Sequence, residues 1–62
     1  MKVTFYKSAQ NYKGDVYKSP LGSFEFNGKI TEAEAVLKAQ KMFEEKMNVS
    51  DWLQVAEFYE VK

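Results

Sequence analysis

The chain has 62 residues, with no cysteine and no histidine, and its nine lysines balance nine acidic residues. This length predicts one domain over residues 1–62, which buries only about 60% of its unfolded surface. Neither a disulfide framework nor a zinc site of the usual Cys/His spacing can stabilise it. The zero net charge argues against a strongly basic nucleic-acid binder and a strongly acidic DNA mimic.

Charge is unevenly distributed along the chain. Residues 1–30 carry five lysines against two acidic residues, a net charge of +3, whereas residues 31–62 carry four lysines against seven, a net charge of −3. No apolar run approaches the roughly 20 residues of a membrane span, and no apolar signal segment follows Met1. We therefore expect a soluble, cytoplasmic protein without membrane contact, complete from its initiator methionine.

The first segment, KVTFYK at residues 2–7, alternates apolar and polar side chains. This alternation predicts a half-buried strand with Val3 and Phe5 facing the core. The following NYKGD segment predicts a turn, because Gly14 can adopt a positive φ. A short strand is then predicted over 15–18.

The SPLG segment predicts a second turn, because the ring of Pro20 presets φ at its position. A third strand is predicted over 23–26, SFEF, and it ends at Asn27-Gly28. The sequence thus predicts three short antiparallel strands before the first helix.

The register between the second and third strands is open. A two-residue turn sets Tyr17 opposite Phe24, whereas a three-residue loop sets Val16 opposite Phe24. The choice matters because a slip of one residue moves every side chain to the other face. We favour the three-residue loop because of the apolar face that it forms. It turns Tyr6 and Tyr17 outward and gathers five apolar side chains on one buried face: Val3, Phe5, Val16, Phe24 and Phe26.

The segment TEAEAVLKAQKMFEEKMN predicts a helix over 32–47. Thr31 and Glu34 have capping-box spacing, and Asn48 suits a left-handed cap at the other end. Met42 lies close to the side opposite the apolar stripe. That predicted stripe consists of Ala33, Val36, Leu37, Gln40, Phe43 and Met47.

The final segment, SDWLQVAEFYEVK, fits two patterns. As a strand it sets Leu53, Val55, Tyr59 and Val61 on one face; as a helix it sets Trp52, Val55, Ala56 and Tyr59 at helical spacing, with Asp51 as cap. Its content of Val, Phe, Tyr and Trp favours a strand over about 54–61.

The predicted architecture is α+β: a small antiparallel sheet of three N-terminal strands plus a C-terminal strand, with one amphipathic helix on one face. The opposite face is expected to stay bare. The side chains expected there are Tyr6, Tyr17, Glu25 and either Trp52 or Phe58.

The inventory of reactive groups predicts no enzyme activity, no cofactor and no metal site. The serines have no obvious base, and the three glycines stand apart from one another.

We predict a small non-catalytic interaction or regulatory module that binds a protein partner or forms a homodimer. An exposed methionine on a helix is an adaptable contact. The predicted partner-binding residues are Tyr6, Tyr17, Met42 and Trp52.

The alternative function is binding of single-stranded nucleic acid. The dipeptide Tyr-Lys occurs three times in thirteen residues, and such binders stack bases on aromatic rings and hold phosphates with lysines. The candidates are Tyr6, Lys7, Tyr12, Lys13, Tyr17 and Lys18. Cross-strand tyrosine packing and lysines that protect an exposed edge explain the same pattern more simply. A charge of +3 is also low for phosphate neutralisation.

The short, cysteine-free, aromatic and charge-balanced style is that of the small reading frames that phages and other mobile elements carry, without a motif that ties the chain to them.

Overall fold

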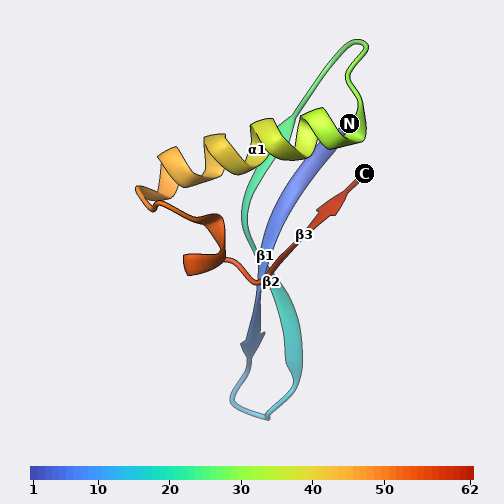
Figure 1. The fold of residues 1–62 in the computed structure, drawn as a ribbon. Coiled ribbons are helices and arrows are strands. Elements are labelled where there is room, and N and C mark those ends of the chain that lie inside the picture. The colour runs from blue at the N-terminus through green and yellow to red at the C-terminus, as the bar shows by residue number, and fades with distance from the viewer.

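The computed structural model describes all 62 residues. Its elements are β1 (Lys2–Gln10), β2 (Val16–Glu25), α1 (Glu32–Met47), a short 3-10 helix η1 (Trp52–Gln54) and β3 (Phe58–Val61). The strands form one antiparallel sheet in the order β2-β1-β3, and α1 lies on one face of it (Figure 1). The predicted α+β architecture is confirmed. No helix is both long and apolar enough to cross a membrane.

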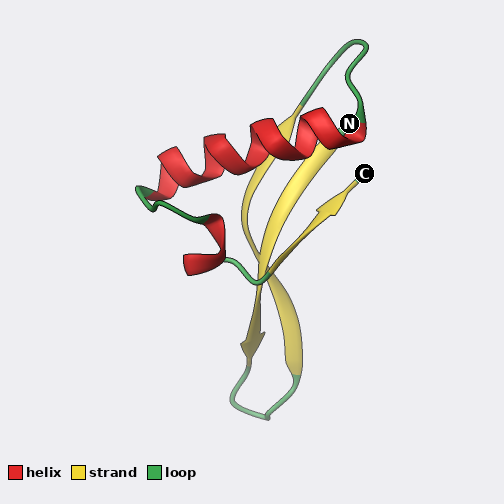
Figure 2. Cartoon of the chain, in the orientation of Figure 1, coloured by secondary structure: helices red, strands yellow, loops and turns green.

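The hairpin of β1 and β2 projects beyond the rest of the sheet (Figure 2). β3 pairs with β1 only from Val3 to Tyr6, so residues 7–19 form a two-stranded ribbon, which we call the arm. The molecule is therefore elongated, with extents of 43 × 25 × 14 Å. The turn at the tip of the arm was predicted correctly: Gly14 has a φ of +86°, and Asn11 Oδ1 accepts hydrogen bonds from two backbone N–H groups.

β2 is one strand where the sequence predicts two strands and a turn. The SPLG turn is wrong, because Pro20 lies inside β2 opposite Tyr6. β2 is an edge strand, where a residue without an N–H group is tolerated. Gly22 lies inside β2 opposite Phe5, where a Cβ would lie 3.4 Å from the ring of Phe43, an ordinary contact distance.

A β-bulge at Leu21 interrupts the pairing, which passes from Gly22 opposite Phe5 to Pro20 opposite Tyr6. The extra residue exchanges the two faces of β2 beyond the bulge. Tyr17, opposite Ala9, therefore lies on the same side of the sheet as α1, and not beside Tyr6 as predicted.

The predicted burial of Val16 is also wrong. Val16 pairs with Gln10 near the end of the arm, beyond the cover of α1, and is 68% exposed. The other predictions for this face hold in part: Val3 and Phe5 are fully buried, whereas Phe24 and Phe26 are half-buried against the core.

The predicted bounds of α1 and both of its caps are confirmed. Thr31 Oγ1 accepts a hydrogen bond of 3.2 Å from the backbone N–H of Glu34. At the other end Asn48 adopts the left-handed conformation, with φ 56° and ψ 48°. The helix is thus bounded by local interactions within its own sequence.

The buried stripe of α1 is turned away from the predicted one. Ala35 and Ala39 are fully buried, whereas Ala33 and Leu37 are exposed. Two small side chains over the sheet let α1 approach the bulky ring of Phe5. The buried apolar core consists of Val3, Phe5, Ala35, Val36, Ala39, Phe43 and Ala56.

The C-terminal segment divides between the two predicted patterns. The predicted strand over 54–61 is confirmed only from Phe58 onward, and one 3-10 turn precedes it. Asp51 Oδ1 caps that turn by accepting a hydrogen bond from Leu53 N–H, and Glu44 Oε2 accepts one from Trp52 N–H. The contact with Glu44 holds η1 against α1 before the chain returns to the sheet.

Candidate protein-binding surfaces

The four predicted partner-binding residues do not share a surface. Tyr6 lies on the sheet face opposite α1, and Tyr17 lies on the α1 side of the arm. Met42 is 44% exposed on α1. Of the two alternatives for the bare face, Phe58 lies there beside Tyr6, whereas the ring of Trp52 packs against Phe5 on the helix side at 5.4 Å between centroids.

The bare face of the sheet carries a cluster of Tyr6, Lys18, Phe58 and Glu60, which we call the outer-face cluster. The rings of Tyr6 and Phe58 stack with centroids 5.4 Å apart. Lys18 Nζ lies 4.8 Å from the centroid of Tyr6 and 2.7 Å from Glu60 Oε2. The hydrogen bond from Lys18 lowers the pKa of Glu60, and that to Glu60 raises the pKa of Lys18. The cluster thus pairs its own charges.

The six candidates for nucleic-acid contact are divided among three places. Tyr6 and Lys18 lie on the outer face, and Lys7 and Tyr17 lie on the opposite face. Tyr12 and Lys13 lie at the tip of the arm. Because Lys18 is already paired with Glu60, these residues do not form one continuous cationic and aromatic track.

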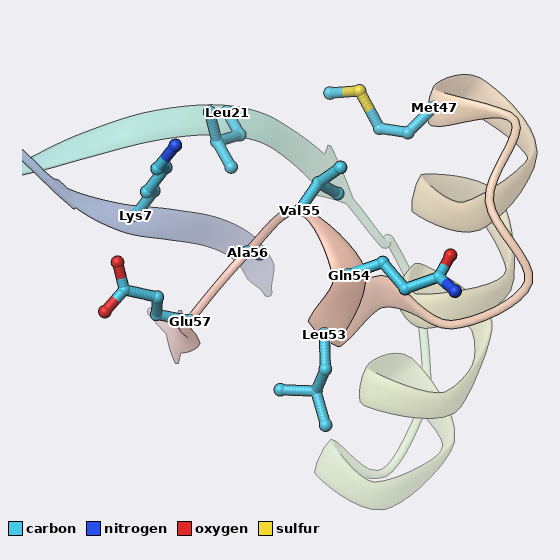
Figure 3. Close-up of a pocket in the computed structure, with 8 residues that line it drawn as sticks. All are labelled: Lys7, Leu21, Met47, Leu53, Gln54, Val55, Ala56 and Glu57. Carbon is cyan, nitrogen blue, oxygen red and sulfur yellow. The ribbon is translucent and has the colours of Figure 1, made fainter.

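A groove of about 460 Å³ opens where the arm meets η1 and the end of α1 (Figure 3). Its apolar lining comes from Leu21, Met47, Leu53, Val55 and Ala56, and its polar lining from Lys7, Gln54 and Glu57. Glu57 Oε1 accepts a hydrogen bond of 3.0 Å from Ser8 N–H and so ties the groove to the arm. The groove is suited to an apolar side chain, with charge at one end only.

A second depression, of about 590 Å³, lies between the start of α1 and β3. Leu37 is 63% exposed beside it, although the sequence pattern assigns Leu37 to the core. We call this surface the flank; it is lined by Glu32, Ala33, Val36, Leu37 and Tyr59.

β3 borders the flank with an unpaired edge. Lys62 and Lys2 exchange two backbone hydrogen bonds, of 2.7 and 2.8 Å. Because backbone groups alternate in direction along a strand, the N–H and C=O groups of Tyr59 and Val61 point away from β1. This edge can pair with a further strand.

No group of three or more acidic side chains is placed to hold a metal ion. Comparison with protein-family models, curated proteins and solved structures finds no match to the chain. The function therefore has to be inferred from these surfaces.

Proposed function

We propose that the chain is a small non-catalytic module that binds a protein through the flank and the edge of β3. One observation carries the proposal: Leu37, a large apolar side chain, is exposed beside backbone groups of β3 that have no partner. Main-chain pairing at a sheet edge supplies affinity, and an adjoining apolar pocket supplies specificity.

The small core supports this proposal. Only eight of the 62 residues are buried. Covering the exposed 63% of Leu37 would contribute about 1–2 kcal/mol to a complex, which is appreciable beside the stability of a domain of this size. A partner on the flank would thus bury the apolar side chains of Leu37 and Tyr59, which α1 and β3 leave exposed.

Protein binding is favoured over binding of single-stranded nucleic acid. Base stacking requires accessible ring faces beside free cations, whereas Tyr6 is stacked on Phe58 and Lys18 is paired with Glu60. The flank itself contains no lysine. The paired Lys18 and the lysine-free flank both disfavour nucleic-acid binding, because its affinity grows with the number of phosphates that the protein neutralises.

Site-specific photo-cross-linking tests the proposal. A photoreactive phenylalanine analogue at Leu37 should form covalent adducts with protein in cells, and the same analogue at Lys38, one residue away on the exposed side of α1, should form few. Equal yields at the two positions would refute binding through the flank. Adducts whose added mass is removed by nuclease would instead identify nucleic acid as the partner.

A further inference from the structure

We propose that the protein bound by the flank is a second copy of this chain, an inference that rests on the proposed function. Two β3 strands pair antiparallel about a two-fold axis perpendicular to the sheet. The result is a six-stranded sheet in the order β2-β1-β3-β3-β1-β2, with both α1 helices on the same face. A two-fold contact of this kind satisfies both free edges with one surface.

The backbone of β3 favours this pairing. With the axis at Glu60, Tyr59 of one copy exchanges hydrogen bonds with Val61 of the other, and both pairs of outward backbone groups are satisfied. The other edge of the sheet is unsuitable, because Pro20 lacks an N–H group and the bulge at Leu21 interrupts the strand.

The outer-face cluster removes the main electrostatic obstacle. Pairing about Glu60 brings the two Glu60 carboxylates opposite each other, which would be destabilising for free like charges. Each carboxylate already has the Lys18 ammonium 2.7 Å away. The local charge at the axis is therefore close to zero.

The gap between the two helices matches the exposed side chains of the flank. Three strand spacings set the two β1 strands roughly 14 Å apart, and α1 packs over β1. This separation exceeds the 8–10 Å of directly packed helices. Leu37 and Tyr59, both exposed, lie where they would fill the space from each side.

Charge along α1 favours the antiparallel arrangement that the two-fold axis imposes. Glu32 and Glu34 precede Leu37, and Lys38 and Lys41 follow it. With Leu37 of the two antiparallel helices facing across the gap, Lys41 of each copy is level with the acidic first turn of the other. A parallel arrangement would set like charges together.

Light scattering after size exclusion tests the association at tens of micromolar. The wild-type chain of 7.2 kDa should elute with twice that mass, and Leu37→Glu should elute as a folded monomer. Met42→Glu is the matched control, because Met42 is also exposed on α1 but lies outside the flank, and it should remain a dimer. A monomeric wild-type chain would overturn the second-copy proposal. Cross-links from Leu37 to another protein would in that case leave the proposed function standing.

A disulfide test locates the axis independently of Leu37. The chain has no cysteine, and directly opposite residues of antiparallel strands lie within disulfide distance. Glu60→Cys should form a covalent dimer at least ten times faster than Glu25→Cys, which is exposed on the other edge strand. Equal rates, or a dimer that survives Leu37→Glu, would overturn the proposed interface. If Leu37→Glu is unfolded by circular dichroism, the cysteine rates alone decide the question.

Discussion

The ring of Phe43 lies stacked on Phe5, with centroids 4.4 Å apart, and both side chains are fully buried. Phe43→Ala removes this stack and leaves a cavity, so we expect a loss of about 3–5 kcal/mol in the free energy of unfolding. A domain of this size has little more to lose. Urea denaturation followed by circular dichroism measures the change.

Met42→Lys is the neighbouring control for that experiment. Met42 is 44% exposed, so a lysine can keep its charge in water, and we expect a free energy of unfolding within about 0.5 kcal/mol of wild type. If Met42→Lys unfolds as readily as Phe43→Ala, the buried side of α1 has been assigned wrongly.

The ion pair of Lys18 and Glu60 predicts a small pH dependence. Its hydrogen bond lowers the pKa of Glu60 in the folded protein, so its stabilisation is present above the unfolded glutamate pKa of about 4.3. It is lost as the pH falls through the lower folded pKa. The raised pKa of Lys18 gives the opposite dependence: stabilisation is lost only as the pH rises above the ordinary lysine range.

An NMR titration of the Glu60 carboxyl carbon checks this prediction. The midpoint should lie below the ordinary glutamate value in wild type and return towards it in Lys18→Gln. In the monomeric Leu37→Glu background the melting temperature should change little with Lys18→Gln, because the pair is exposed to solvent there. An unchanged midpoint in Lys18→Gln would show that the pair does not persist in solution.

At the scale of elements, α1 was predictable because local sequence determines both of its ends. The cap at Thr31 needs only a hydroxyl and a helical N–H three residues later, and Asn48 needs only its own tolerance of positive φ. β2 was misread because Pro20 and Gly22 have two uses. Pro20 suits an edge strand as well as a turn, and Gly22 pairs with Phe5 inside the strand.

The flank was missed because a helical pattern identifies apolar residues but not which of them the sheet covers. Leu37 and Val36 are equally apolar in sequence, yet only Val36 is covered. The sheet covers Ala35 and Ala39, which lie in the same buried cluster as Phe5, and so leaves Leu37 outside. The bulge at Leu21, which moved Tyr17 to the other face, likewise depends on pairing between strands and not on either strand alone.

The cap of α1 allows a test at this scale. Thr31→Ala removes the acceptor of the Glu34 N–H and should lower the free energy of unfolding by about 1 kcal/mol. Thr31→Ser retains the hydroxyl and should remain close to wild type. Thermal denaturation of the two variants separates them, and equal losses would mean that the side-chain methyl group, and not the hydrogen bond, is what matters.

At the scale of the whole molecule, core and arm are distinct. Every buried residue lies in 3–5, in α1 or at Ala56, and none lies between residues 7 and 19. Two polar contacts join the arm to the C-terminal segment: Ser8 N–H with Glu57, and Lys18 with Glu60. The arm therefore adds length to the molecule without adding to its apolar core.

This division predicts that the arm can be shortened without unfolding the protein. Lys7 and Ser19 are paired across the strands, and an Asn-Gly type I′ turn joins such a pair with two residues. A variant in which Asn-Gly replaces residues 8–18 should keep the near-UV circular dichroism of its buried aromatic rings. With Glu60→Gln added, which removes the charge that Lys18 balances and that the shortened arm would leave unpaired at the axis, it should also remain a dimer, because the flank and the edge of β3 are retained. A folded but monomeric variant would move the interface from the flank to the arm, and an unfolded one would show that the paired backbone of the arm is needed to hold β1 and β2 in register across the bulge.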